Sequence, residues 1–443
     1  MTAVRLWLAR RLFPLLATAV LIAAGMLATT VAAHLVRTWE ADLTGKPALA
    51  LPADLWSTLI AARRLAHLNL RGLYRPPTGL VAFPGAALIL VPVVAVIDAA
   101  GLGLAAPTAS NPHLGAWLLA GPYEMAVSGL ALFAADAIAE RLGVARSKRA
   151  LLAGAGAFAL ANVSLAGGHP EDAVAVALLL FGVLALSGSH VARSGWLIGA
   201  ALAVQPLTIL ALPVVLATRS ARQIPGYLIR AAVPSAVLLG AAAAANWKAT
   251  VSAVTSQPNW PSVDHATPWT SLAPHLSDGA VAAGPGRVLA ILLACGCALV
   301  LRRRWRGRGT RLMSEWSPEF LRELLWWVAA ALAIRCAFEP VMVAYYLWPA
   351  LAVALITASS RWSRLTSTSL TAALLTVAAA AGWPGPWIWW SLTVTGLGLV
   401  LFLAHPPHSD RQDPASAAPR PPSAARPAAA ILAAWRPDQA MMG

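Results

Sequence analysis

Long apolar segments without charge dominate this chain. Uncharged runs of roughly 18 residues or more recur along its 443 residues, and each is long enough to cross a hydrocarbon core about 30 Å thick. Only 12% of the residues are charged, which is about half the fraction found in a soluble domain. The alternating ten-residue segments typical of a transmembrane β-barrel do not recur. The sequence therefore predicts an all-α integral membrane protein.

The positions of these runs predict how many times the chain crosses the membrane. We expect residues 1–404 to form a polytopic bundle of about 12 transmembrane helices. The first run follows a charged start and is predicted to be a membrane helix with a cytoplasmic N-terminus, not a cleaved signal. Residues 405–443 are rich in Pro and Ala, and we expect them to form a disordered cytoplasmic tail. The runs centre near residues 24, 92, 126, 158, 180, 207, 235, 290, 330, 350, 375 and 396.

The net charge of +15 is carried mostly by short segments between apolar runs, such as 141–149 (RLGVARSKR) and 302–311 (RRRWRGRGTR). This distribution is typical of the cytoplasmic loops of a protein of the cytoplasmic membrane, and we predict no nucleic-acid partner. The three cysteines lie inside apolar runs, which argues against a disulfide framework or a zinc cluster. We predict no metal site and no cofactor.

Two long loops, 35–79 and 247–279, are predicted on the extracytoplasmic side. Between them, two topologies are consistent with the sequence. If 196–218 is one ordinary span, the basic segment 141–149 lies outside, against the usual charge bias. If that segment instead enters and returns, with a break at Gln205-Pro206, the motif GGHPED (167–172) lies outside. A second irregularity near Pro84 or Pro92 is then required. We favour the broken version, in which protein must cover the broken helix.

The first long loop carries an acid and several arginines. Asp54 opens a predicted short helix, for which an Asp is a good N-cap. Arg63, Arg64, Arg71 and Arg75 follow and place positive charge outside the membrane. Anionic headgroups would attract such a loop, and membrane lipids are thus expected partners. A lipid-linked phosphate is the other ligand that the arginine side chains could bind in a bidentate manner.

The order of these features resembles a known enzyme family. Asp54, a short helix, the Gly-Leu-Tyr of residues 72–74 and a Pro-rich span beginning FPG resemble the start of GT-C superfamily glycosyltransferases. More narrowly, they resemble actinobacterial mannosyltransferases that use polyprenyl-phosphate sugars. GGHPED stands where those enzymes carry Gly-Gln-x-Asn, and AVQPLTILALPVVLATRS resembles their Pro-broken span. The resemblance covers roughly residues 10–360 and implies a GT-C-like fold.

The resemblance also implies roles for individual residues. Asp54 would be the catalytic base, and Glu40 and Asp42 are rival acids in the same loop or simply solvated charges. A carboxylate near neutral pH takes the proton of the acceptor hydroxyl, and cations offset the charge of the leaving phosphate. The substrate-binding residues predicted in these two regions are Arg64, Arg71, Tyr74, Arg75, His169, Glu171, Asp172 and Gln205. The alternative for GGHPED is that its acids only cap a helix beginning at Ala173.

A late segment, 334–356, carries further ionisable residues. Arg335 and Glu339 are four residues apart and could pair on one helix face, before a turn or kink at Pro340. Because ionisable groups inside membrane segments are costly, we predict a substrate-binding role for Arg335, Glu339, Tyr345 and Tyr346, with Arg335 holding the donor phosphate. The alternative is an interfacial ion pair with an aromatic belt.

The second long loop contains His265 among several tryptophans and prolines. These side chains could form a platform on which a sugar ring stacks, with His265 in the acceptor site. The alternative is a loop anchored at the membrane interface by its tryptophans.

The leading hypothesis is a membrane glycosyltransferase on the outer face of the cytoplasmic membrane. It would move a sugar, with mannose the first choice, from a polyprenyl-phosphate donor to an envelope glycolipid or polysaccharide acceptor. A transporter or flippase for a lipid-linked envelope precursor is the alternative from another class, although the sequence shows no matching halves. A non-catalytic membrane protein of envelope assembly is the third hypothesis.

Overall fold

The computed structural model describes residues 5, 7, 9–39, 53–75, 80, 82–104, 114–262, 264–307, 316–381 and 385–406. Phe13–Pro406 forms one compact unit and is described by itself; the other unit comprises Met1–Leu12 and Pro407–Gly443. Glu40, Asp42 and the predicted tail beyond Pro406 lie outside the described residues.

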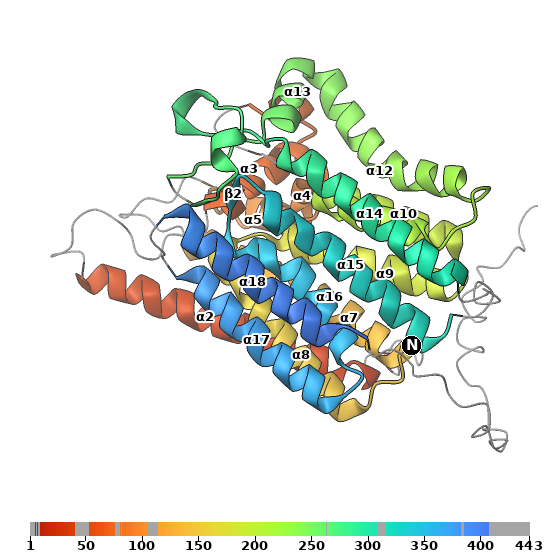
Figure 1. Cartoon of the computed structure of the whole chain (residues 1–443). Helices are drawn as coiled ribbons and strands as arrows, with labels where there is room; N and C mark the ends of the chain where they lie inside the picture. The colour runs from red at the N-terminus through yellow and green to blue at the C-terminus, as the bar shows by residue number, and fades with distance from the viewer. Residues whose placement is uncertain are drawn as a thin grey trace, which may run out of the picture. The chain divides into compact units, whose positions relative to one another are not determined.

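The described part of the chain is helical, and its one sheet has two strands of two residues each (Figure 1). Strands β1 (His265–Ala266) and β2 (Val341–Met342) pair antiparallel, with His265 opposite Met342. The first helix runs five residues further than expected and occupies the start of the predicted first loop. The α-helices are α2 (Leu12–Trp39), α3 (Ala53–Ala66), α4 (Pro84–Leu88), α5 (Val91–Ala99), α6 (Leu114–Ser128), α7 (Leu130–Arg141), α8 (Arg146–Ala161), α9 (Pro170–Ser187), α10 (Val191–Val204), α11 (Leu212–Leu216), α12 (Ile224–Ala245), α13 (Trp247–Ser256), α14 (Gly286–Gly307), α15 (Pro318–Phe338), α16 (Trp348–Ala358), α17 (Trp362–Ala380) and α18 (Pro386–Ala404). The shorter helical turns are η1 (Leu70–Gly72), η2 (Asn162–Gly167), η3 (Pro206–Leu210), η4 (Thr270–Leu272), η5 (Ser277–Gly279) and η6 (Ala344–Leu347).

Apolar helices with exposed apolar surface indicate a membrane protein. Within the described ranges, four helical segments are long and apolar enough to cross a membrane: Gly115–Arg141, Pro170–Ser187, Ile224–Ala245 and Pro386–Ala404. Only 11% of the most apolar part of α12 is buried, so most of that helix presents hydrocarbon outward. A soluble monomer rarely exposes apolar surface on this scale. Breaks at prolines shorten several other apolar helices, and the count of about 12 spans stays a prediction.

The predicted break at Gln205-Pro206 is confirmed. Helix α10 ends at Val204, the backbone of the next residue, Gln205, is extended (φ −143°, ψ 110°), and the chain continues as η3 and α11. Ser194 Oγ lies 2.8 Å from the Tyr227 hydroxyl, and further along both helices Gly199 packs against the Arg230 carbonyl. Contacts that advance together along α10 and α12 mean that the two helices run parallel. The chain must therefore return between them, through η3 and α11.

The second irregularity required by that topology lies in α4 and α5. The two helices are separated by a turn at residues 89–90. At the start of this segment the Tyr74 hydroxyl donates to the Ala82 carbonyl over 3.1 Å, and at its end Asp98 pairs with Arg63 of α3 at 3.1 Å. Both ends thus contact the α3–η1 region, and the segment enters and returns. The α4–α5 segment also meets the other break, because Gly85 packs against the backbone of Ala203.

The basic segments gather at one end of the bundle. Arg322 Nη2 donates to the Leu142 carbonyl over 2.9 Å, and Lys148 Nζ donates to Ser360 over 2.8 Å. Trp305 Nε1 donates to Glu323 over 3.0 Å, which brings residues 302–306 to the same place. We call this the basic end, defined by residues 141–149 and 302–306.

Helix α8 leads from the basic end to the GGHPED motif. Its 16 residues span about 24 Å at about 1.5 Å per residue. His169 lies two residues after the end of η2, and its ring contacts Asp54 of the first loop. We call the region around Asp54 and His169 the site end. The single-span topology would separate these two residues by the thickness of the bundle, and the structure is inconsistent with it.

We expect the basic end and the site end to face opposite sides of the membrane. In a background without the three native cysteines, a membrane-impermeant maleimide added to intact cells should label only one of Ser147→Cys (basic end) and Thr255→Cys (α13). Both positions are exposed, and both variants should be labelled after lysis. Labelling of both from one side would contradict the arrangement.

The close packing of α10 on α12 predicts a sharp size limit at Gly199. A Cβ at this position would lie 2.7 Å from the Arg230 carbonyl oxygen, so Gly199→Ala should destabilise the protein by about 1–3 kcal/mol. Gly154→Ala in α8 is the matched control, since a Cβ there meets no atom within 4 Å. Thermal unfolding in detergent measures both, and equal midpoints would refute the tight contact.

Candidate functional site

Asp54 and His169 are the first pair at the site end. Asp54 is the second residue of α3, so it lies within the first turn of that helix and not before it. Asp54 Oδ2 lies 3.1 Å from His169 Nε2, across 115 positions of sequence. The Asp54 side chain is 64% exposed, whereas that of His169 is 14% exposed. The carboxylate is thus open to solvent, while the residue that holds it is enclosed by the protein.

Glu171 contacts the other ring nitrogen of His169. Glu171 Oε1 lies 2.6 Å from His169 Nδ1, and the Glu171 side chain is 3% exposed. Helix α9 begins at Pro170, three residues before the predicted start at Ala173, so Glu171 lies in its first turn. The sequence alternative that these acids only cap a helix from Ala173 is therefore wrong in its boundary, and it misses the contact with His169.

The charges of this group shift the pKa values of Asp54 and His169. The hydrogen bond from His169 lowers the pKa of Asp54. Burial opposes a charge on His169, but the negative charge of Glu171 and the hydrogen bonds to Asp54 and Glu171 raise the pKa of His169 well above its usual value. Asp54 is therefore ionised at neutral pH, and His169 favours its cationic form.

An aromatic side chain covers His169. The rings of His169 and Tyr345 lie 4.2 Å apart between centroids, with an angle of 32° between their planes. Gly167 permits this approach, because a Cβ there would lie 2.9 Å from the Tyr345 ring. Tyr345 also contacts Tyr346 edge to face at 5.0 Å. The η6 turn thus forms one wall of the site, and the substrate-binding role of Tyr345 and Tyr346 stays a prediction.

Asp172 connects the GGHPED motif to the broken helix. Gln205 Nε2 donates to Asp172 Oδ1 over 2.5 Å, and Asp172 is 1% exposed. Gln205 is the extended residue at the break, so its side chain can reach back to α9. The charge of Arg335 also acts on Asp172. The structure therefore unites two predicted motifs that lie 33 residues apart in the sequence.

A second ionic cluster centres on Glu339. The predicted pair is confirmed, with Arg335 Nε 3.1 Å from Glu339 Oε2. Arg287 also donates to Glu339 Oε1, through Nε at 2.9 Å and Nη2 at 2.5 Å. The Glu339 side chain is fully buried, and the Arg335 guanidinium lies 3.8 Å from the centroid of the Tyr346 ring. Two cations and one anion leave this cluster with a net positive charge.

The sequence analysis assigned no role to three ionisable residues of this region. Arg287, at the start of α14, completes the Glu339 cluster and also bonds the side chain of Gln257. Asp264, next to the predicted His265, lies near enough for the charge of Asp54 to act on it, and burial together with that charge raises the pKa of Asp264 to about 6. Asp264 thus supplies a second carboxylate near Asp54.

Glu124 is the third residue to which the sequence analysis assigned no role. It is fully buried in α6, and neither carboxylate oxygen has a hydrogen-bond partner among the described residues. The charges of Glu171 and His169 act on it. A single carboxylate inside an apolar run is a functional candidate by default, so the sequence held the signal that would have identified it.

Two of the residues predicted to bind substrate, Arg64 and Tyr74, form hydrogen bonds with the backbone. Arg64 donates to the backbone carbonyls of Gly72 and Arg75, and thereby closes the turn that follows α3. Tyr74 donates to Ala82, and burial raises the pKa of its hydroxyl. Arg71 and Arg75 are exposed on the same turn. Their guanidinium groups lie at the surface of the site end.

His265 lies against the wall of the bundle. Its ring stacks on Trp389 of α18 at 4.2 Å between centroids, with an angle of 14°. Pairing of β1 with β2 fixes its backbone opposite Met342. His265 therefore anchors the second loop to the bundle, and the adjacent Asp264 is the residue that approaches Asp54 electrostatically.

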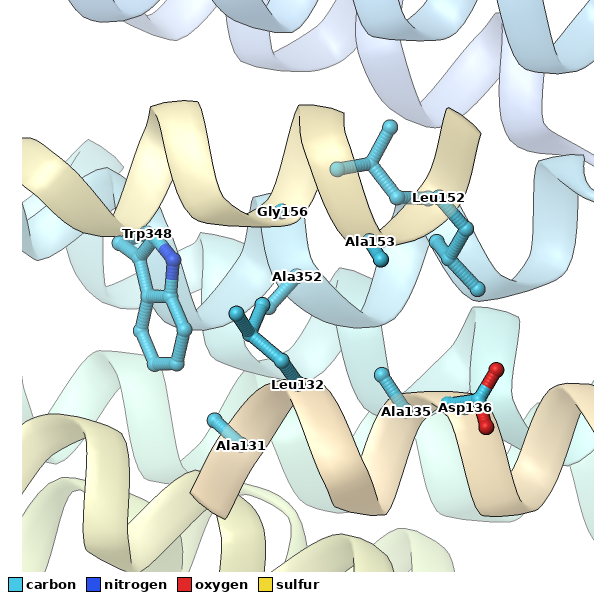
Figure 2. Close-up of a pocket in the computed structure, with 10 residues that line it drawn as sticks. Ala131, Leu132, Ala135, Asp136, Leu152, Ala153, Gly156, Trp348 and Ala352 are labelled. Atoms are coloured by element: carbon cyan, nitrogen blue, oxygen red, sulfur yellow. The ribbon is translucent and has the colours of Figure 1, made fainter. Parts of the chain in front are cut away.

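A small apolar cavity lies away from these groups, between α7, α8 and α16 (Figure 2). Asp136 is the charged residue among those that line it, and Arg149 holds that carboxylate at 2.5 and 2.7 Å. Asp54, His169, Glu171 and Asp172 are not among the residues that line this cavity. The lining comprises Ala131, Leu132, Ala135, Asp136, Leu152, Ala153, Gly156, Trp348, Ala352 and Leu355.

Over the residues that the structure describes, no group of three or more His, Cys, Asp or Glu side chains is arranged to hold a metal ion. Comparison with protein-family models and with curated proteins found no match for this chain. The functional argument therefore rests on the residues and their geometry.

The Glu339 cluster yields a prediction on stability. Glu339→Gln would leave two partly buried guanidinium groups facing a neutral amide, and we expect a loss of about 3–5 kcal/mol. Glu319→Gln, at an exposed position in the first turn of the same helix, should change stability by less than about 0.5 kcal/mol. Thermal unfolding in detergent compares the two variants. Similar midpoints would show that Glu339 does not hold this cluster together.

Proposed function

We propose that this protein is a GT-C-like membrane glycosyltransferase. It would transfer a sugar, mannose in the first instance, from a polyprenyl-phosphate donor to an envelope glycolipid or polysaccharide. The observation that carries the proposal is Asp54, an exposed carboxylate held on one oxygen by an enclosed histidine. A general base needs this combination of access to substrate and fixed orientation.

The reaction uses the second oxygen of Asp54. His169 occupies Oδ2, which leaves Oδ1 to accept the proton of an acceptor hydroxyl. The hydroxyl oxygen then forms a bond to the anomeric carbon, and the bond from that carbon to the phosphate oxygen of the donor breaks. Since the leaving group is a polyprenyl phosphate, the step needs positive charge near that oxygen.

Two groups of arginines can supply this charge. Arg335 Nη1 is buried and has no hydrogen-bond partner in the described part of the chain, so it can donate to a phosphate oxygen. Arg71 and Arg75 are exposed at the site end, where they would attract an anionic lipid carrier. The net positive Glu339 cluster supports the binding of a phosphate, with Arg335 as the donor.

The membrane orientation follows from the charges. The basic end carries most of the short Arg- and Lys-rich segments and is assigned to the cytoplasm, which places Asp54 on the outer face of the cytoplasmic membrane. In this arrangement about 12 segments cross or enter the bilayer. Both chain ends are then cytoplasmic.

One observation favours transport of a lipid-linked precursor as the second candidate. The two broken segments, α4–α5 and α10–α11, meet where Gly85 packs against Ala203. Discontinuous helices that meet inside a bundle frequently form substrate sites in transporters. The buried and unpartnered Glu124 is also a group that a proton-coupled carrier would use.

The decisive experiment measures turnover. Purified protein given radiolabelled polyprenyl-phosphate mannose and membrane acceptors should release free polyprenyl phosphate, and Asp54→Asn should lower the rate by about 10²–10⁴-fold. Asp98→Asn is the matched control, because Asp98 pairs with Arg63 near the end of α3, whereas Asp54 lies in the first turn of that helix. Unchanged turnover in Asp54→Asn would exclude the assigned base. No turnover, combined with movement of the lipid across proteoliposomes, would establish the transporter instead.

A further inference from the structure

The surroundings of His169 restrict its protonation state. Both ring nitrogens face carboxylate oxygens: Nε2 faces Asp54 at 3.1 Å and Nδ1 faces Glu171 at 2.6 Å. A neutral imidazole has one donor nitrogen and one acceptor nitrogen, and an ionised carboxylate can only accept. Two ionised carboxylates therefore require two N–H donors, which only the imidazolium ion provides.

We infer that His169 is an imidazolium ion that positions the Asp54 carboxylate, and that Glu171 is the anchor that maintains this charge. His169 touches neither donor nor acceptor in this scheme, so it is a positioning residue. The inference deepens the proposed function and rests on it where it concerns turnover. The charge state of His169 can be measured without turnover.

The titratable groups around the ring are carboxylic acids and one phenol. Asp54 faces it from α3, Glu171 and Asp172 from α9, and Tyr345 from η6. The charges of Glu124 in α6 and Asp264 in the second loop also act on it. No cation of the described residues contacts the ring, and the nearest cationic cluster is paired with Glu339.

The arrangement assigns different tasks to the two oxygens of Asp54. The N–H of a cationic His169 holds Oδ2 and keeps the side chain in one orientation, whereas Oδ1 stays available to an acceptor hydroxyl. Loss of the His169 proton would remove one of its two N–H donors. Either Asp54 or Glu171 would then face an acceptor nitrogen, and the carboxylate would turn away.

The first test reads the charge directly. The protein is labelled with [¹⁵N]histidine, and the His169 signals are identified by difference from His169→Gln. At about pH 7.5, above the ordinary histidine pKa of about 6.5, both ring nitrogens of His169 should carry protons. The neutral pattern, with one protonated and one bare nitrogen, would overturn the inference. This measurement does not use Glu171→Gln and stands even if that variant does not fold.

The second test uses the pH dependence of turnover. Below its raised pKa His169 is a cation, so activity should fall as the pH rises through that pKa. Glu171→Gln removes the anchoring charge and should move this basic limb to lower pH. His169→Gln should abolish the basic limb and move the acidic limb to higher pH, because Asp54 loses the hydrogen bond that lowers its pKa.

The kinetic constants separate positioning from substrate binding. His169→Gln should lower kcat by about 10²-fold, as expected when a catalytic group is misplaced, and leave KM nearly unchanged. His190→Gln is the control, because His190 is exposed in the turn between α9 and α10. A raised KM with unchanged kcat, or an unmoved basic limb in Glu171→Gln, would refute the positioning role. If the wild-type protein shows no turnover while His169 is doubly protonated, the proposed function fails and the assigned charge holds.

Discussion

The pairing of charges inside an apolar bundle is the constraint on which the rest of this structure depends. An ion taken out of water without a partner carries a penalty of several kcal/mol, so buried ions must meet opposite charges or hydrogen-bond donors. His169 lies between Asp54 and Glu171, and Glu339 lies between Arg287 and Arg335. The contacts of His169 with Asp54 and of Arg287 with Glu339 join elements distant in sequence, and so they fix how the helices assemble at the site end.

The broken helices make this pairing possible. A continuous span through Gln205 would carry the following chain to the other end of the bundle, and the GGHPED motif could not then share an end with Asp54. Because α10 stops at an extended residue, the Gln205 side chain reaches Asp172 and the chain returns through α11. The backbone at the break is covered by Gly85 of α4, which meets the requirement that broken helices be enclosed by protein.

The local features of the site could be predicted from single stretches of sequence. Prolines 84, 92 and 206 mark the irregular helices, and the i, i+4 spacing of Arg335 and Glu339 predicts their pair, which is confirmed. The sequence predicted that Asp54 and His169 lie on the same side of the membrane only in the topology that is broken at Gln205-Pro206. Arg64 and His265 show the limit of such reasoning, because residue type alone does not distinguish a ligand-binding side chain from one that closes a turn or stacks on Trp389.

The sequence by itself determined that the chain is helical and apolar, where its helices break, and which acids and arginines are scarce enough to matter. These properties follow from composition and from neighbouring residues, which act over one or two helical turns. Only the tertiary structure decided that Arg287 joins Glu339, that Asp264 approaches Asp54, and that Glu124 is buried near Glu171. Those relations depend on how the helices pack against one another, and packing is set by contacts between segments that no local pattern connects.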